Sequence, residues 1–158
     1  KETNPDILSN AELIPVEDDY FDTVIATELL EYVPDVGKVL GEIYRVSKEK
    51  SNIIISIPFL HPIHGDYWQD RHRLTALQID EISKNAGFKV CLIEPMGSVG
   101  SVVFDLLRVS FGYASKSRLK NIYLFILGFF RLFFQLLDGI FRNQRAYINT
   151  GYFILLTK

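Results

Sequence analysis

The stretch from residue 20 to residue 58 constrains the fold of this chain more than any other feature. Its elements are, in order, a β-branched run at 21–26, apolar residues at helical spacing over 36–46 and an uninterrupted apolar run at 53–57. This order predicts a strand, a helix and a second strand covered on both faces, as a parallel strand is. A unit of this size forms a right-handed crossover in an α/β sheet. Ligands of such sheets bind beyond the carboxyl ends of the strands, so we expect functional residues near Thr27, Glu28 and Pro58.

The rest of the chain predicts more elements of one α/β domain. At 158 residues and 48% hydrophobic content it is long enough to bury a core. Thr75 has the chemistry of a helix N-cap and Gly87 that of a helix end, which predicts a helix over 76–85. Further expected elements are a strand at 88–93, a helix at 102–111 and a last strand at 152–156, antiparallel beside 88–93. The fold class is therefore α/β, with a mostly parallel twisted sheet and an antiparallel last strand.

The net charge of −2 hides an uneven distribution of charge. Residues 1–35 hold ten acids against one lysine, and residues 108–145 hold seven lysines and arginines against Asp138 alone. Cys91 is the only cysteine and lies in an apolar run, so we expect an inert thiol in a buried strand and no internal disulfide. No signal peptide is visible, and we expect a cytoplasmic protein, either free or at the inner face of the membrane.

Several motifs follow one another through the first part of the chain. In order they are Asn10-Ala11-Glu12-x-x-Pro15-Val16, Asp19-x-Phe21-Asp22-x-Val24-Ile25, Glu28-x-Leu30-Glu31-Tyr32-Val33-Pro34-Asp35, Leu40-x-Glu42-Ile43-x-Arg45-Val46 and Ile55-Ser56-Ile57-Pro58. With these motifs the chain resembles the class I S-adenosylmethionine-dependent methyltransferases of small molecules, typified by the enzymes of ubiquinone and menaquinone biosynthesis. Residues 59–88 are similar, less tightly, to the substrate-loop region of methyltransferases from surface-polysaccharide and lipid-linked sugar pathways.

The resemblance implies a Rossmann-like fold, S-adenosyl-L-methionine as the cofactor, and methyl transfer to a hydroxyl or carboxyl of a small acceptor, such as a lipid-linked or saccharide molecule. The implied cofactor-binding residues are Asn10, Ala11, Glu12, Thr27, Glu28 and Tyr32. Two family features are absent from the sequence: the glycine-rich turn for the methionine end of the cofactor, and the acid that binds its ribose. On the family's layout, residues 1–158 are the C-terminal part of one methyltransferase domain lacking its first strands, and we expect this chain alone to be inactive.

Two other interpretations stay open at this point. The chain is a non-catalytic remnant, or it is a membrane-associated binding module that uses the same scaffold. By residue type alone, Asn10 is a turn residue and Glu28 is a charge at the start of a helix. The motif context favours the cofactor-binding interpretation of both residues.

Four charged residues around the predicted helix have structural interpretations. Glu31 and Asp35 precede the helix, where acids favour the helix dipole, and we interpret them as structural. Glu42 and Arg45 are three positions apart, which predicts a surface pair of little energetic value. The alternative is that Glu42 grips a neighbouring loop.

The loop at 59–75 gathers all three histidines of the chain within twelve positions. His64 is the candidate catalytic residue, since an imidazole titrates near neutral pH and can act as a general base. Arginines bind phosphate or carboxylate through paired hydrogen bonds, and aromatic rings stack on sugars. The candidate substrate-binding residues are His61, Asp66, Tyr67, Trp68, Arg71 and Arg73. The histidine spacing matches no metal-ligand motif, so we expect no metal; a solvated loop held by its aromatic residues is the alternative.

The segment 119–141 is rich in leucine, isoleucine and phenylalanine, which make up 15 of its 23 residues, and it predicts one helix. Its polar residues, which include Arg131, Gln135 and Asp138, fall on one narrow stripe, and these internal charges argue against a transmembrane span. A helix with so much apolar surface is either buried in a homodimer or lies in the interface of an anionic membrane. We expect residues 102–145 to form a helical, apolar and basic insertion in the domain, and we expect no nucleic acid partner.

Overall fold

The strand–helix–strand unit forms where the pattern of apolar residues predicts it. The computed structural model describes residues 5–63, 69–112 and 118–158, without the side chains of residues 111–120. β1 (Phe21–Thr27) is followed by α1 (Val36–Val46) and β2 (Ser47–Pro58), and the two strands are parallel neighbours. Asp35 is the N-cap of α1, since its side chain accepts a hydrogen bond from the backbone N–H of Lys38. The apolar residues that were expected on one face of this helix are all buried.

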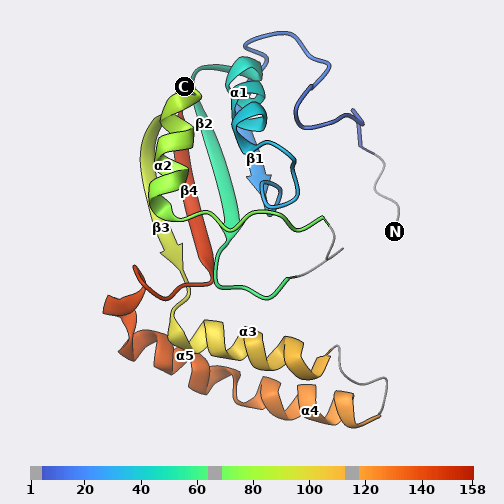
Figure 1. Cartoon of the computed structure of the whole chain (residues 1–158), viewed down its shortest axis with the longest axis vertical. Coiled ribbons are helices and arrows are strands. Elements are labelled where there is room, and N and C mark those ends of the chain that lie inside the picture. Colours follow the sequence, from blue (N-terminus) through green and yellow to red (C-terminus); the bar gives the residue numbers. More distant parts are fainter. Residues whose placement is uncertain (1–4, 64–68, 113–117) are drawn as a thin grey trace.

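Among the described residues the sheet has four strands, in the order β1-β2-β4-β3. β3 (Lys89–Met96) and β4 (Gly151–Thr157) complete it, and β4 is antiparallel both to β2 and to β3. β1, β2 and β3 therefore run in one direction and β4 runs against them (Figure 1). This confirms the predicted α/β fold with a mostly parallel sheet and an antiparallel last strand.

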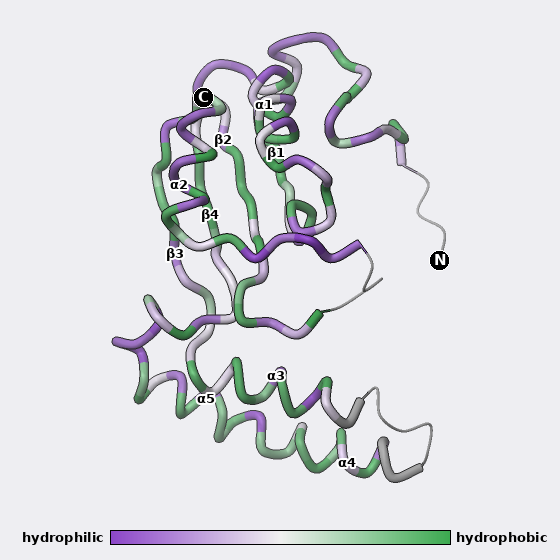
Figure 2. Tube along the Cα trace, viewed as in Figure 1, coloured by the Kyte–Doolittle hydropathy of each residue, from purple (hydrophilic) through white to green (hydrophobic). Residues whose placement is uncertain are grey.

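The hydrophobic core lies between one face of the sheet and two helices, α1 and α2 (Ala76–Asn85). Thr75 caps α2 in a capping box with Gln78, which confirms the predicted N-cap. Figure 2 shows the apolar residues that follow β2 and β4 through the core. Five of their side chains are at most 1% exposed: Ile53, Ile55, Ile57, Ile154 and Leu156. Burying one such side chain stabilises the fold by about 1.5–3 kcal/mol.

The opposite face of the sheet is largely open in the part of the chain that the structure describes. Ile25 on β1 is 66% exposed and Leu92 on β3 is 41% exposed, and they share this face with the half-buried Ile54 of β2. The prediction that β2 is covered on both faces is therefore wrong for the described residues. The reason is that α1 and α2 lie on the same side of the sheet (Figure 1).

Between β3 and β4 the chain forms a helical insertion (residues 99–144). It consists of α3 (Val99–Gly112), α4 (Arg118–Phe129), α5 (Arg131–Ile140) and the short 3-10 helix η1 (Arg142–Gln144). The prediction of one helix over 119–141 is wrong, because the chain bends by 43° at Phe130, between α4 and α5. The bend lets both helices pack against α3. In Figure 1 the insertion lies beyond the carboxyl ends of β1 and β2.

Polar contacts hold the insertion together and join it to the sheet. Thr150 donates two hydrogen bonds to the carbonyl oxygen of Met96, from its N–H at 2.9 Å and from its hydroxyl at 3.0 Å. The buried carboxylate of Asp138 in α5 accepts hydrogen bonds from the N–H of Ser101, at 3.0 Å, and from the hydroxyl of Ser101. Ser101 lies in the first turn of α3, where a negative charge favours the helix dipole. Asp138, the only acid in residues 108–145, therefore points into the insertion.

The prediction that Cys91 is buried is wrong. Its side chain is exposed, although the apolar run around it predicts a buried strand. The register between β3 and β4 shifts between Val90 and Leu92, so Cys91 falls at an irregularity of an edge strand. The sequence pattern cannot show such a shift, because it depends on the pairing partner.

Glu42 and Arg45 form a network that joins α1 to the segment before β1. The carboxylate of Glu42 accepts a hydrogen bond from the N–H of Ile14 at 2.7 Å and two from Arg45 at 2.7 and 2.9 Å. The guanidinium of Arg45 also donates to the carbonyl oxygens of Ile14 and Val16, both at 2.9 Å. The side chain of Glu42 is only 10% exposed. The prediction of a surface pair of little value is therefore wrong, and the alternative, that Glu42 grips a neighbouring loop, is confirmed.

The substitution Glu42→Gln is expected to lower the free energy of unfolding by about 1–2 kcal/mol at neutral pH, because it removes the charge from a largely buried hydrogen-bonded pair. The hydrogen bonds from Arg45 are the main cause that lowers the pKa of Glu42 below its ordinary value. Because this pKa is lower in the folded protein than in the unfolded chain, the ionised carboxylate stabilises the fold at pH values above the ordinary glutamate pKa. This stabilisation disappears as the pH falls through the pKa of the folded protein. Urea denaturation at neutral and acidic pH measures both effects.

The matched control for Glu42→Gln is Asp80→Asn, which also turns an acid of a helical ion pair into an amide. Asp80 pairs with Lys84 on the surface of α2, with side chains 31% and 61% exposed. Ion pairs on the surface contribute little to the free energy of unfolding, so this variant should unfold at the same urea concentration as the wild type. An equal loss of stability in both variants, or a difference for Glu42→Gln that persists unchanged in acid, would contradict the proposed network.

Candidate functional site

The carboxyl end of β1 is held in an unusual backbone conformation. Glu28, the residue after the strand, has a φ of 50°, which is rare for a residue other than glycine. Its N–H donates to the carbonyl oxygen of Ser56 in β2 at 3.1 Å, and its carboxylate accepts a hydrogen bond from the Ser56 hydroxyl at 2.8 Å. Thr27, the last residue of the strand, is exposed. Non-glycine residues with positive φ occur often at functional sites, which makes this strand end the first part of a candidate site.

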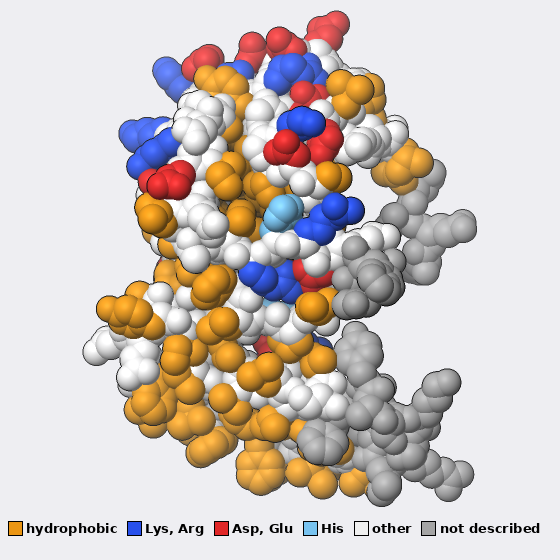
Figure 3. Space-filling model, in the orientation of Figure 1, with side chains coloured by type: hydrophobic (Ala, Val, Ile, Leu, Met, Phe, Trp, Pro, Cys, Tyr) orange, Lys and Arg blue, Asp and Glu red, His pale blue; other side chains and the backbone are white. Residues whose placement is uncertain are grey.

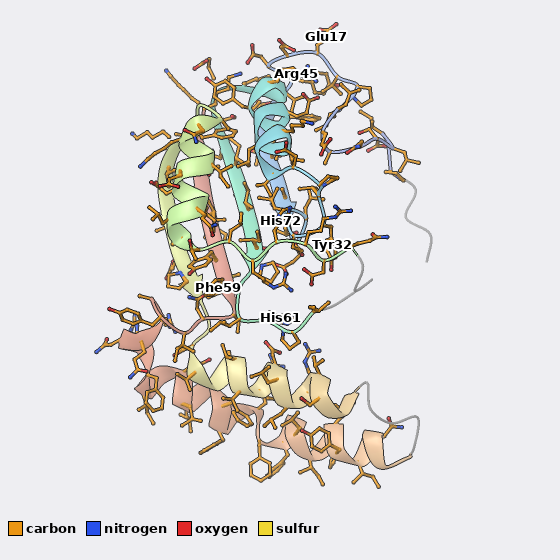
Figure 4. The ribbon with its side chains drawn as sticks, viewed as in Figure 1. Glu17, Tyr32, Arg45, Phe59, His61 and His72 are labelled. Carbon is orange, nitrogen blue, oxygen red and sulfur yellow. The ribbon has the colours of Figure 1, made fainter. Side chains whose placement is uncertain are left out.

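The second part is the limb of the loop that returns to α2, residues 69–75. The N–H groups of Arg71 and His72 donate to the carbonyl oxygen of Glu31, at 2.7 and 3.3 Å. The Nε2 of His72 lies 2.9 Å from the carbonyl oxygen of Val33. Figure 4 shows Tyr32 and His72 on the side of the domain that faces the insertion. The fold thus brings the residues after β1 against a limb that lies about forty positions later in the sequence.

Negative charge gathers around Tyr32. Burial, followed by the charges of Glu31 and Asp70, raises the pKa of Tyr32 above its ordinary value. The side chain of Glu31 is 0% exposed, and that of Asp70 is 1% exposed. Arg73 partly offsets this charge, since its guanidinium binds both carboxylate oxygens of Asp70. Acidic side chains therefore gather at this strand end, and Arg73 pairs with one of them.

The two arginines of this limb have different surroundings. Arg73 binds Asp70 and also donates to the carbonyl oxygen of His72 at 2.8 Å, so it holds the loop together. Arg71 is exposed, although its backbone is fixed on Glu31. Of the two arginines predicted to bind an anionic acceptor, Arg71 is the one open to solvent.

The limb of the loop that leaves β2 connects the sheet with the insertion. The N–H of Phe59 donates to the carbonyl oxygen of Thr150 at 2.7 Å, which continues the contact between β2 and β4. His61 follows, with its Nδ1 2.9 Å from the carbonyl oxygen of Pro62 and its Nε2 3.7 Å from the carboxylate of Asp105 in α3. Figure 4 shows His61 between the sheet and the insertion. The candidate site therefore lies between the ends of the strands and α3.

The predicted cofactor-binding turn at Asn10 is held by its own contacts. The side-chain oxygen of Asn10 accepts a hydrogen bond from the N–H of Glu12 at 3.1 Å, and its carbonyl accepts one from Leu13 at 3.0 Å. Ala11 packs against the hydrophobic core. The Oε1 of Glu12 is buried, and it has no hydrogen-bond partner among the described residues. A buried acceptor in this state is open to an N–H or O–H donor from a ligand.

Other predicted residues fall outside the described part of the chain. The candidate catalytic residue His64 and the substrate candidates Asp66, Tyr67 and Trp68 are all in residues 64–68.

Within the described residues, no group of three or more histidine, cysteine, aspartate or glutamate side chains could hold a metal ion. A groove of about 680 Å³ lies between α1 and α2 and is lined by His72, Leu74 and Asn85 among others. It is on the helical side of the domain.

From the sequence, Glu31 is expected to be structural, and Asp70 and His72 have no predicted role. All three take part in the contacts at the strand end. The carbonyl oxygen of Glu31 accepts hydrogen bonds from the loop backbone, Asp70 pairs with Arg73, and His72 contacts the carbonyl oxygen of Val33. The spacing of Asp70 and Arg73, opposite charges three positions apart, was the one available signal for this pair. The contacts of Glu31 and His72 join distant segments and have no local signal.

The comparisons with known proteins agree with this architecture. Residues 1–55 match the family model described as a methyltransferase domain. The solved structures that share the fold include the [4+2]-cyclase SpnF, with 19% identity, a TM-score of 0.54 and coverage of 95% of this chain and 54% of that chain. A SAM-dependent methyltransferase from Archaeoglobus fulgidus has 17% identity, a TM-score of 0.57 and coverage of 96% and 66%. No curated protein sequence matches the chain.

A further solved structure was determined with a ligand. It is phosphoethanolamine N-methyltransferase 2 from Haemonchus contortus in complex with S-adenosyl-L-methionine, with 16% identity, a TM-score of 0.58 and coverage of 94% of this chain and 36% of that chain. At these identities the similarity shows the fold. The chain spans about half the length of SpnF, 54%. The resemblance to class I S-adenosylmethionine-dependent methyltransferases is confirmed in the fold and in the match over residues 1–55.

Proposed function

We propose that this chain serves S-adenosylmethionine-dependent methyl transfer to a hydroxyl or carboxyl of a small acceptor, such as a lipid-linked or saccharide molecule. One observation carries the proposal. Thr27, Glu28 and Tyr32 belong to the residues that match the methyltransferase family model, and they lie at or just after the carboxyl end of β1. The limb 69–75 folds back on the same segment, with contacts to the carbonyl oxygens of Glu31 and Val33. Ligands of open α/β sheets bind at such strand ends.

The residues at the strand end fit the chemistry of the cofactor. S-adenosylmethionine supplies, when bound, a methyl group on a positively charged sulfonium. The acidic side chains of Glu31 and Asp70 near Tyr32 suit a cationic group. The buried Oε1 of Glu12 offers an acceptor to an N–H or O–H group. The residues that would hold the cofactor are those of the predicted set: Asn10, Ala11, Glu12, Thr27, Glu28 and Tyr32.

The loop at 59–75 binds the methyl acceptor in this proposal. Methyl transfer requires the acceptor oxygen to be held in line and water to be excluded. A hydroxyl acceptor also loses a proton, for which His64 is the candidate base, whereas a carboxylate acceptor needs no base. The exposed Arg71 suits a phosphate or carboxylate group of the acceptor. The cytoplasmic location expected from the sequence stays a prediction.

A non-catalytic binding module is the second candidate function. Such a module would hold a ligand at the same strand end without transferring a methyl group. SpnF also shows that proteins with this fold include a cyclase, so the fold alone does not decide the reaction. A ligand titration separates a chain with a cofactor site at the strand end from one without such a site.

Titration of residues 1–158 with S-adenosylhomocysteine, followed by amide NMR, tests the proposal. We expect weak binding, with a dissociation constant of about 1 mM, because the motifs for the methionine end and the ribose are absent from the sequence. The shifts should concentrate at residues 10–12, 27–33 and 69–73. An unrelated nucleotide, guanosine monophosphate, is the control ligand. Shifts confined to other residues would argue against the site. A low-micromolar dissociation constant would show that tight binding does not need the motifs for the methionine end and the ribose.

A further inference from the structure

The helical insertion exposes an apolar surface that the fold of the domain does not use. We define the outer face as the exposed apolar side chains of α4 and α5. The most exposed members are Phe129 at 80%, Phe125 at 79%, Ile140 at 73%, Leu132 at 66% and Leu136 at 62%. Figure 3 shows apolar side chains across much of the insertion, whereas charged side chains gather on the rest of the domain. Soluble monomers rarely leave a continuous apolar patch of this kind without an interaction partner.

The geometry of α5 separates the outer face from the side that packs on α3. At 100° per residue, Leu132, Leu136 and Ile140 fall on one arc. Asp138 lies on the opposite side, where it binds Ser101 of α3. Arg131 and Gln135 line a hollow shared with α3, which places the polar stripe predicted from the sequence beside α3. The side chains of this apolar arc therefore do not take part in the packing of α5 on α3.

The charges of the insertion favour an anionic partner. Residues 97–150 contain seven lysines and arginines and only two acids, Asp105 and Asp138. Asp138 is buried, and Asp105 lies 3.4 Å from Arg108 and 3.7 Å from His61, with its side chain 19% exposed. Arg142, the first residue of η1 and two positions after the end of α5, is exposed. An apolar face on an insertion rich in basic residues, with its acids turned inward, is the pattern of a helix that lies in the interface of an anionic membrane.

An apolar hollow adds to this pattern. It has a volume of about 330 Å³ and lies among the three helices, lined by Leu107, Leu127 and Phe130 among others. Tyr123 also lines it, but the hydroxyl of Tyr123 donates to the carbonyl oxygen of Leu107 at 3.1 Å and is thus satisfied inside the protein. A hollow without a free polar group suits a hydrocarbon chain.

Membrane binding by the insertion need not involve a span. None of the described helices is by itself long and apolar enough to cross a bilayer, and α4 with α5 reaches the required length only as a pair bent by 43°. We propose that the outer face of α4 and α5 binds the surface of an anionic lipid membrane, with the apolar side chains among the acyl chains and the basic residues at the headgroups. This proposal stands independently of methyl transfer.

Flotation of the full chain with lipid vesicles tests the proposal. The wild type should float with vesicles of phosphatidylcholine and phosphatidylglycerol, and less so at high salt or with phosphatidylcholine alone. The double substitution Phe129→Glu with Leu136→Glu should reduce binding by at least about tenfold, because it places charges on both helices of the outer face. Arg142→Gln should reduce binding by about fivefold, which corresponds to one basic residue near an anionic surface.

The matched control is the double substitution Leu13→Glu with Leu77→Glu. These leucines are 73% and 66% exposed but lie outside the insertion, so this variant should float like the wild type. Circular dichroism verifies that each variant is folded. The proposal is overturned if the folded wild type ignores anionic vesicles, or if both double variants lose binding equally. It is also overturned if the wild type is a dimer that does not float and the variant of the outer face is a monomer, since a second copy would then cover this face.

Discussion

Replacing Gly151 by alanine is expected to lower the free energy of unfolding by more than about 3 kcal/mol, or to prevent folding. Gly151 is the first residue of β4 and pairs with Pro58 of β2 and Met96 of β3. A Cβ added here would lie 2.4 Å from the carbonyl oxygen of Ile57 and 3.1 Å from the Cα of Pro58. Both atoms belong to the backbone of β2, which cannot move aside without breaking the pairing at the strand end. The same shift would displace the loop that begins at Phe59.

The control for Gly151→Ala is Gly41→Ala in α1. Apart from the backbone of α1 and the neighbouring residues in the chain, no described atom lies within 4 Å of the Cβ that this substitution adds. Alanine in a helix interior is more favourable than glycine by about 0.5–1 kcal/mol, so Gly41→Ala should stabilise the chain. Urea denaturation measures both variants against the wild type. A Gly151→Ala variant that unfolds at the midpoint of the wild type would show that β2 and β4 are not as closely packed as described.

The central elements of the fold could be predicted because their signals are local. The apolar run at 53–57, the helical spacing of 36–46 and the cap at Thr75 depend on neighbouring residues in the sequence, and each forms the expected element. The direction of the last strand was also predicted correctly. Hydrophobic periodicity and capping chemistry are properties that one segment carries by itself.

The errors all concern features that depend on distant partners. The coverage of β2 depends on which side α1 and α2 pack, and the exposure of Cys91 depends on the register between β3 and β4. The bend at Phe130 has no proline to mark it, and it is explained by the packing of α4 and α5 on α3. A single sequence shows none of these partners.

The candidate site was predictable in its position and only partly in its composition. The rule that ligands bind beyond the carboxyl ends of parallel strands pointed to Thr27 and Glu28, and the structure adds the positive φ of Glu28 and its bonds to Ser56. The negative charge around Tyr32 could not be predicted. It arises because Asp70 comes close to Tyr32 only when the loop folds back on the strand end.

In the full-length protein, His64→Ala is expected to lower the turnover of a hydroxyl acceptor by about 100-fold, the usual contribution of a general base. Arg71→Ala should lower kcat/KM by about tenfold, because it removes a charged hydrogen-bonding group from an anionic acceptor. Both variants should keep their affinity for S-adenosylhomocysteine within about twofold, since the proposed cofactor-binding residues lie elsewhere. Calorimetry measures this affinity. Lys84→Ala is the control, because the side chain of Lys84 is 61% exposed on α2.

The most direct test of the proposed site is the transfer of tritium from S-adenosyl-L-methionine, labelled in its methyl group, into a lipid extract of the source cells by the full-length protein. Release of volatile label by base would identify a methyl ester and hence a carboxyl acceptor, whereas base-stable label would exclude a methyl ester and would be the result expected of a hydroxyl acceptor. We expect transfer by the wild type and by Lys84→Ala and a loss with Arg71→Ala, together with a loss with His64→Ala if the label is base-stable. If the wild type transfers no label, or if the site variants lose cofactor affinity and keep their binding of the acceptor, the proposed site is contradicted.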